Sequence, residues 1–186
     1  MSLAATVWAA EPVRPAHAEP DRDNQLIDVR AFNRSAQVAL QQRKGRRITE
    51  QRFIEMAKEP STVVLDTRSA ANFRLLHVKG ARHLNFSEIT TQSLSRVIPD
   101  KDTRILIYCN NNFDNEPNEG RPAFESKSPG MALNIPTYIT LFAYGYRNVY
   151  ELGPLLDVRE TNIPLAGVKL AFMKQPISKL KQRNQP

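Results

Sequence analysis

The chain has 186 residues, of which 41% are hydrophobic and 24% charged, as expected for a globular protein with a core of ordinary size. No run of about 18 apolar residues occurs, so we expect no membrane span. The single cysteine, Cys109, excludes an internal disulfide and a metal site built from several cysteines.

The excess of positive charge lies at the periphery. Four basic residues stand between positions 43 and 47. Five more, and no acidic residue, follow position 168: Lys169, Lys174, Lys179, Lys181 and Arg183. Without these nine charges the formal net charge falls from +7 to −2. We therefore expect a basic C-terminal tail over residues 157–186 and no nucleic-acid partner, because no recognition motif accompanies the charges.

Residues 1–24 are expected to form a leader outside the fold. Residues 1–10 are small and apolar, and residues 7–9 and 16–18 have the small-x-small pattern that precedes signal cleavage, although no basic residue precedes Arg14. The segment is therefore interpreted as a truncated signal sequence or a cloning remnant. The first reading predicts a periplasmic protein, and the alternative is a cytoplasmic protein with a disordered leader.

Two helices are predicted before the first strand. Apolar residues at helical spacing predict a helix over residues 28–42, followed by a basic hinge that contains Gly45. Thr49 is the expected N-cap of a second helix, which ends before Pro60. The first helix belongs to an N-terminal helical extension over residues 25–47, which we expect to pack onto the main domain.

Buried strands alternate with helices in the remainder of the chain. Apolar and β-branched runs predict strands over residues 62–66, 104–108 and 148–152. Helices or short extended segments are predicted over residues 69–76, 82–85, 87–97 and 135–142, and Gly145 is expected to end the last helix. This alternation predicts an α/β domain over residues 48–156, with a mainly parallel sheet flanked by helices.

Cys109 directly follows the predicted strand over residues 104–108. Ligand sites of parallel sheets lie beyond the carboxyl ends of the strands, so this position favours a nucleophile, while a buried packing residue is the alternative. A thiol with a pKa of about 8.5 is only about 3% thiolate at pH 7. We expect the N–H groups of a tight loop and of the next helix to lower the pKa of Cys109. Without a second cysteine, a thioredoxin-like role is disfavoured.

Four sequence blocks resemble the successive signatures of the rhodanese-like family. They are residues 64–68, 77–85, 107–109 and 145–152, in the family's order and spacing over about residues 48–156. The resemblance implies a parallel sheet flanked by helices and a strand-end cysteine that accepts sulfur as a persulfide and passes it on. It also implies that Asp66 and Arg68 support the site.

The loop after Cys109 departs from the family pattern by an insertion within residues 110–130. The expected substrate-binding residues of this loop are Asn110, Asn111, Asn112, Phe113, Asp114, Arg121 and Lys127. The asparagines tolerate left-handed backbone angles and favour a cradle for sulfur, with an ordinary polar turn as the alternative. The acidic residues of the loop exceed its basic residues by two, so Arg121 and Lys127 are the candidates for binding an anion. Asn134 is the expected N-cap of the following helix.

We predict a sulfurtransferase that takes sulfur from a small donor and gives it to a thiol acceptor, either a small molecule or a protein, without a cofactor. Its persulfide would form on Cys109. His77 and His83 are too few for a metal site, so no metal is expected. The alternative is a non-catalytic rhodanese-fold module that binds a protein through loop 110–130. A cysteine phosphatase is a remote alternative, because the arginine that it needs six residues after the cysteine is replaced by Asn115.

Overall fold

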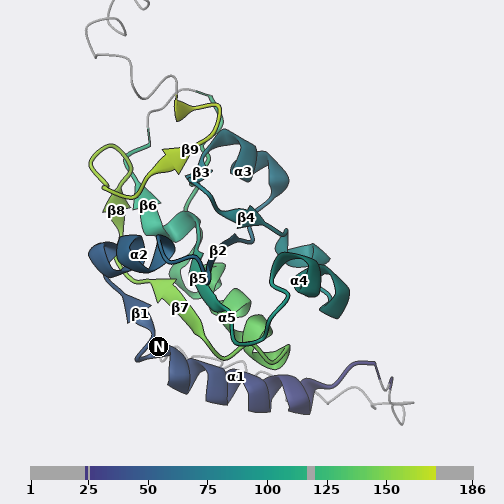
Figure 1. The fold of residues 1–186 in the computed structure, drawn as a ribbon. Coiled ribbons are helices and arrows are strands. Elements are labelled where there is room, and N and C mark those ends of the chain that lie inside the picture. Colours follow the sequence, from purple (N-terminus) through teal and green to yellow (C-terminus); the bar gives the residue numbers. More distant parts are fainter. Residues whose placement is uncertain (1–23, 25, 117–119, 171–186) are drawn as a thin grey trace, which may run out of the picture.

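The computed structural model describes residues 24, 26–116 and 120–170 (Figure 1). The predicted leader therefore lies outside the described residues except for Asn24, as does the part of the predicted tail after residue 170. Within the described part of the chain, no helix is long and apolar enough to cross a membrane.

Five parallel strands form the central sheet in the order β1-β7-β5-β2-β4. Their bounds are β1 Arg47–Ile48, β2 Thr62–Asp66, β4 Arg82–His83, β5 Arg104–Tyr108 and β7 Val149–Leu152. The predicted strands over residues 62–66 and 104–108 are confirmed residue for residue as β2 and β5. They pair in register, so that Asp66 lies opposite Tyr108 at the carboxyl ends. The predicted α/β fold with a mainly parallel sheet is confirmed.

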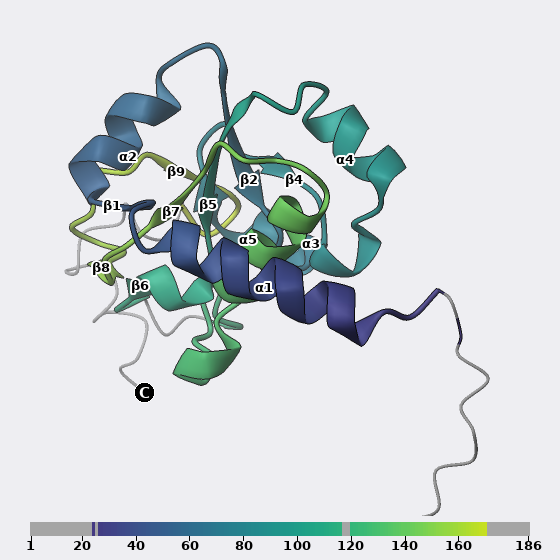
Figure 2. The same cartoon turned by 90° about the horizontal axis from the view of Figure 1, so that it is seen from below.

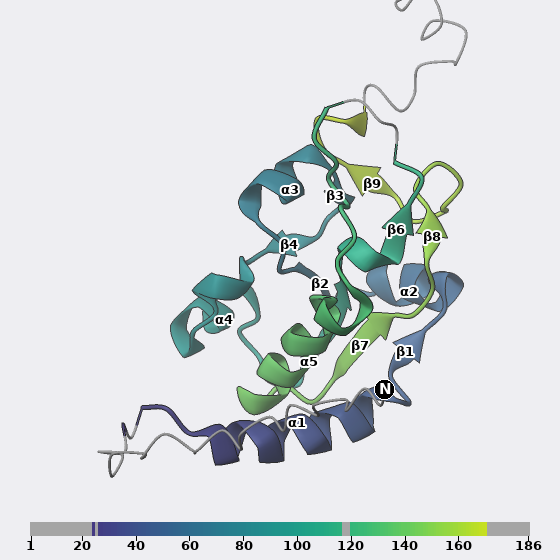
Figure 3. The same ribbon diagram turned by 180° about the vertical axis from the view of Figure 1, so that it is seen from behind.

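Helices cover both faces of this sheet. Their bounds are α1 Val29–Arg43, α2 Glu50–Ala57, α3 Ala70–Leu75, α4 Thr91–Val97 and α5 Asn134–Ala143. Ile105 and Ile107 of β5 point into a core shared with α1, α4 and α5, while Leu106 and Tyr108 point into a second core with Phe53 of α2. Figure 2 shows α1 lying along α5, and Figure 3 shows α5 in front of the sheet from behind. The N-terminal extension therefore packs on the domain as predicted.

Local capping sets the helix ends where the sequence places them. The backbone N–H of Ala31 donates to the Asp28 carboxylate at 2.7 Å, and that of Arg52 donates to the Thr49 hydroxyl at 3.3 Å. Gly145 follows α5 with a φ of 91°, a conformation that suits glycine. The helix predicted over residues 87–97 is divided, because the extended Thr90 caps α4 and leaves only the 3₁₀ turn η1 (Phe86–Glu88) before it.

The segment after β7 is folded where the sequence predicted a tail. β8 (Leu156–Asp157) pairs with β6 (Phe113–Asp114), and β9 (Leu165–Ala166) pairs with β3 (His77–Val78). Val158 and Ile163 are buried in the second core. The tail assignment from residue 157 is therefore corrected up to residue 170. The prediction was wrong because this segment is held by tertiary packing. Two-residue strands and two buried side chains give no periodic pattern that the sequence would reveal.

Candidate active site

Cys109 stands at the carboxyl end of β5 with its residue 1% exposed. Its backbone is extended, and it precedes the 3₁₀ turn η2 (Asn110–Asn112). The Cys109 N–H donates to Asn112 Oδ1 at 2.9 Å, and the Asn112 amide nitrogen donates to the carbonyl oxygen of Leu152 at 2.9 Å. Asn112 thus ties the cysteine to the end of β7, so the position of the sulfur is fixed by the sheet.

Asn134 also holds this loop, and it does not have the role expected of it. It is the first residue of α5 rather than its N-cap, and it is buried. Its side-chain nitrogen donates to Asn112 Oδ1 at 2.9 Å. The prediction of an N-cap was wrong because the helix start is decided by this contact across the loop, which a local pattern does not contain.

A pocket of about 310 Å³ lies beside Cys109. Its walls come from the end of α1, the edge strand β1, the end of β7, η2 and the start of α5. Besides the cysteine, its polar lining residues are Arg43, Arg47, Asn111, Asn112, Asn134 and Glu151. The strand-end cysteine therefore faces a cavity, as expected of a nucleophile.

Burial raises the pKa of the Cys109 thiol above its ordinary value. Hydrogen bonding from the backbone of Asn134, Asn111 and Leu133 acts in the opposite direction, and the negative charge of Glu151 adds to the rise. The hydrogen bonding comes from one residue of η2 and from two residues at which α5 begins. The expectation of a lowered pKa was wrong, because the loss of water around the buried sulfur outweighs these donors.

One wall of the pocket is an ion-paired cluster. Glu151 of β7 accepts from Arg43 at 2.5 and 2.6 Å, and the Arg47 Nε lies 3.7 Å from the same carboxylate. The Glu151 side chain is 4% exposed, while those of Arg43 and Arg47 are 21% and 51% exposed. The predicted basic hinge is therefore corrected, because two of its arginines contact a buried carboxylate and hold this corner in place. Together, Arg43, Arg47 and Glu151 leave one net positive charge at the pocket wall.

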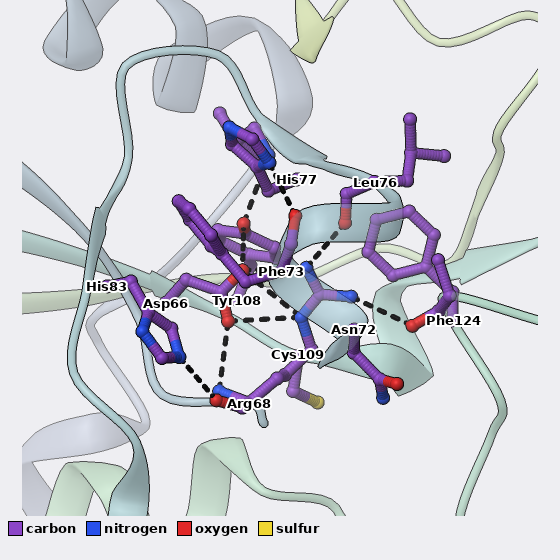
Figure 4. A network of polar contacts seen from close by, with 12 residues as sticks. Asp66, Arg68, Asn72, Phe73, Leu76, His77, His83, Tyr108, Cys109 and Phe124 are labelled. Atoms are coloured by element: carbon purple, nitrogen blue, oxygen red, sulfur yellow. Dashed lines mark hydrogen bonds and ion pairs between the residues drawn. The ribbon is translucent and has the colours of Figure 1, made fainter. Parts of the chain in front are cut away.

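A second ion pair lies on the neighbouring strand and is sealed from solvent. Arg68 donates to Asp66 at 2.6 Å, and it also donates to the carbonyl oxygens of Leu76 and Ala123. Tyr108 Oη donates to the Asp66 carboxylate at 2.5 Å. Figure 4 shows this network around Arg68, with Cys109 drawn beside it. Among the described residues none of these hydrogen bonds reaches the thiol, so Asp66 and Arg68 act by positioning the strand end and Ala123 of the inserted loop.

Burial would lower the pKa of the Arg68 guanidinium, but hydrogen bonding and attraction to Asp66 raise it overall. Burial and the charge of Asp66 raise the pKa of Tyr108 well above its usual range. At neutral pH the cluster therefore holds a charged arginine, which pairs with the Asp66 carboxylate, and a neutral phenol.

The structure divides the loop residues that the sequence placed in one site. Asn111 and Asn112 line the Cys109 pocket, whereas Asn110, Arg121 and Lys127 line another pocket of about 530 Å³ beside α3. In that second pocket, Arg121 donates to Asn72 at 3.1 Å. The two cations proposed for the cysteine site therefore face a different cavity.

Phe113 and Asp114 serve the packing of the loop. Phe113 is fully buried, with its ring 4.5 Å from that of Phe124. Asp114 lies in β6, where its carbonyl oxygen accepts from Val158 at 3.0 Å. Neither residue lines the Cys109 pocket. The inserted loop is thus anchored in the second core by its own aromatic side chains.

The Glu116 carboxylate of the loop is held away from the Cys109 pocket. Glu116 accepts from the backbone N–H groups of Ala123 and Phe124 at 2.8 and 2.9 Å and pairs with Lys169. Asn115, which stands where a phosphatase needs arginine, donates to Asp157 at 2.9 Å. Among the described loop acids, Asp114, Glu116 and Glu125 do not line the Cys109 pocket, while Glu119 lies outside the described residues.

Four polar residues of the pocket were not singled out by the sequence as site residues: Arg43, Arg47, Asn134 and Glu151. The only signal for the arginines was the cluster of basic residues between 43 and 47, which reads equally well as a solvated hinge. Glu151 lies within a block that resembles the family, but nothing in that block marks it as buried beside the cysteine. Within the described ranges, no group of three or more side chains could hold a metal ion.

Comparisons with known proteins agree with this architecture. The sequence model described as Rhodanese-like domain matches residues 49–153, more than half of the chain. No curated protein matches the chain.

Several solved structures are similar to it, among them the following three. The BH2092 protein from Bacillus halodurans is 16% identical, with a TM-score of 0.49, over 81% of this chain and 98% of that one. The rhodanese-like domain of the Alr3790 protein from Anabaena sp. is 15% identical, with a TM-score of 0.48, over 70% and 84%. A rhodanese with anions from E. coli is 23% identical, with a TM-score of 0.34, over 57% and 98%.

Proposed function

Because the chain belongs to the rhodanese-like domain family, we propose that it is a sulfurtransferase that carries sulfane sulfur as a persulfide on Cys109. Its partners are a small sulfur donor, such as thiosulfate or an organic persulfide, and a thiol acceptor, and no cofactor takes part. The observation that carries the proposal is the placement of Cys109 at the carboxyl end of the central strand, where it lines a cavity.

The first half-reaction loads the cysteine. The Cys109 thiol gives up its proton to solvent, and the thiolate attacks the sulfane sulfur of the donor. A new S–S bond forms to Cys109 while the donor's bond to that sulfur breaks. The electron pair of the broken bond leaves with the donor, as sulfite from thiosulfate or as a thiolate from an organic persulfide.

The second half-reaction unloads it. The acceptor thiolate attacks the outer sulfur of the Cys109 persulfide, and the electron pair of the breaking S–S bond returns to Cys109. The two steps together transfer one sulfur atom and require no outside oxidant or reductant. Backbone hydrogen bonding from Asn111, Leu133 and Asn134 favours the charged form of the thiol, and it would stabilise the anionic sulfur in both steps, as in an oxyanion hole.

The proposal is tested by sulfur loading of the single thiol. The protein is incubated with thiosulfate or an organic persulfide, and its intact mass is measured before and after addition of a thiol acceptor. We expect a gain of about 32 Da, corresponding to one sulfur atom, which disappears on transfer. Cys109→Ala should gain nothing, and Asn110→Ala is the matched control because Asn110 does not line the pocket. Absence of any adduct with every donor would overturn the proposal.

A binding module is the second candidate, favoured by the raised pKa of Cys109 and by the exposed face of the inserted loop. Residues 125–131 are all exposed, and Met131 retains 69% exposure. In this case a protein partner would bind equally well to Cys109→Ala, while shortening of residues 125–131 would abolish binding. Binding that requires Cys109 would count against this candidate.

A further inference from the structure

The two arginines of the Cys109 pocket lie outside the matched family domain. Arg43 ends α1 and Arg47 begins β1, whereas the family match starts at residue 49. Both nevertheless line the cavity that holds the thiol. The N-terminal extension therefore contributes the pocket's cationic wall, and the matched domain alone lacks it.

The two arginines differ in how many of their guanidinium N–H groups already have acceptors within the protein. Arg43 places its Nε and Nη2 on the Glu151 carboxylate at 2.5 and 2.6 Å, so it neutralises that buried charge. Arg47 donates one hydrogen bond, from Nη2 to the carbonyl oxygen of Gly153 at 3.0 Å, and its Nε is 3.7 Å from Glu151. The Nη1 of Arg47 has no acceptor among the described residues, and its side chain is 51% exposed. Arg47 thus offers an uncommitted charged donor at the pocket wall.

The size and charge of the pocket define what it would admit. Its volume of about 310 Å³ equals about ten water molecules, which is room for a small organic molecule rather than for an inorganic ion alone. The charges of Arg43, Arg47 and Glu151 leave one net positive charge at the wall. This balance favours a group with a single negative charge, such as a carboxylate, and guanidinium groups bind carboxylates with good geometry.

We propose that Arg47 binds the carboxylate of a small organic sulfur donor at Cys109, with Arg43 holding Glu151 neutralised, so that the N-terminal extension determines the substrate specificity of the site. The donor's sulfane sulfur then lies at the thiol and its carboxylate lies at the β1 edge. The inference deepens the proposed function and rests on it for the identity of the ligand as a sulfur donor.

The test uses two reagents of nearly equal size that differ in charge. Iodoacetate carries a carboxylate and iodoacetamide carries a neutral amide, and both alkylate the same thiol. The rate ratio of iodoacetate to iodoacetamide at Cys109, measured by intact mass, is compared with the ratio for N-acetylcysteine in the same buffer. We expect the protein to show a higher ratio than the free thiol, and the excess to shrink as salt is added because Arg47 is half-exposed.

Substitutions assign the effect to Arg47. Arg47→Gln should lower the ratio by a factor between about 1.4 and 5, the range expected for one half-exposed charge pair, while Arg47→Lys retains most of it. Arg52→Gln is the matched control, since it removes an exposed arginine of α2 that does not line the pocket. An unchanged ratio in Arg47→Gln, an equal fall in both rates, or no alkylation of Cys109 by either reagent would overturn the inference.

Sulfur loading separates this inference from the proposed function. If the ratio behaves as expected but no donor adds sulfur to Cys109, the pocket binds carboxylates and the sulfurtransferase proposal fails. If sulfur loads with equal efficiency from neutral and carboxylate-bearing persulfides, and Arg47→Gln does not change this, the transferase proposal stands and the role of Arg47 fails.

Discussion

Strand β5 ends between two buried carboxylates, and the arginines that pair with them differ in their exposure to solvent. On one side Asp66 of β2 pairs with Arg68, and on the other Glu151 of β7 pairs with Arg43 and Arg47. The first pair is closed, with both side chains at most 1% exposed. The second is open, because a carboxylate that is 4% exposed is held by arginines that reach solvent.

This difference assigns the closed pair to support of the fold and the open pair to recognition of a ligand. Arg68 uses four of its five N–H donors on Asp66, Leu76 and Ala123, and its side chain is only 1% exposed, so its charge is committed to contacts within the protein. Arg47 keeps Nη1 uncommitted among the described residues and faces the cavity of Cys109. An ion pair sealed from solvent fixes geometry, whereas an ion pair at a cavity wall with an exposed donor is available for binding.

The largest effect is expected from opening the closed pair. Arg68→Gln leaves the Asp66 carboxylate buried without its cation, which should lower the free energy of unfolding by about 3 to 5 kcal/mol. Urea unfolding followed by circular dichroism measures this loss. The double variant Asp66→Asn, Arg68→Gln removes both charges and should be less destabilised than the single variant. Equal stability of the wild type and Arg68→Gln would contradict the supporting role.

A smaller loss is expected on the open side. Arg43→Gln should cost about 2 to 3 kcal/mol of unfolding free energy, because Arg47 and solvent still stabilise the Glu151 carboxylate. The same urea experiment measures it, with Arg30→Gln in the first turn of α1 as a control for the loss of a charge from that helix. A cost equal to that of Arg68→Gln would remove the distinction between the two pairs.

Glu151→Gln should change the chemistry of the cysteine more than the stability of the fold. The negative charge of Glu151 disfavours the thiolate and thereby raises the pKa of Cys109, so its removal should lower that pKa. The rate of alkylation by iodoacetamide rises with pH as the thiolate forms, so its midpoint should move to lower pH in Glu151→Gln. Asp66→Asn is the informative comparison, since the closed pair is not among the main influences on the thiol. An unmoved midpoint in Glu151→Gln would contradict this prediction.

The smallest effect on stability is expected from Arg47→Gln. A half-exposed ion pair with 3.7 Å between the charged atoms contributes about 0.2 to 1 kcal/mol. Thermal unfolding should therefore differ little from that of the wild type, although the preference of Cys109 for iodoacetate falls. A large drop in melting temperature would make Arg47 a structural residue and remove its assignment to recognition.

The strands β2 and β5, the helix cap at Thr49 and the placement of Cys109 at a strand end follow from the sequence. Each depends on neighbours a few residues apart: a continuous apolar run, a capping side chain, or the first polar position after a buried strand. The site residues whose location was predicted wrongly are placed by contacts between residues that are distant in the sequence. Arg121 and Lys127 were placed at the cysteine by proximity along the chain, yet the loop anchored by Phe113 and Phe124 carries them to another cavity.

The sequence by itself therefore determined the α/β fold, the family and the placement of the Cys109 sulfur atom at the end of a buried strand. Only the tertiary structure decided which charges surround that atom. Arg43 and Glu151 are 108 residues apart and meet because β1 is added to the edge of the sheet beside β7 and α1 packs along α5. Periodicity and capping depend on residues a few positions apart, so they can be recognised in the sequence. The electrostatics of a pocket depend on burial and on ion pairs between residues that packing brings together, and no local pattern contains them.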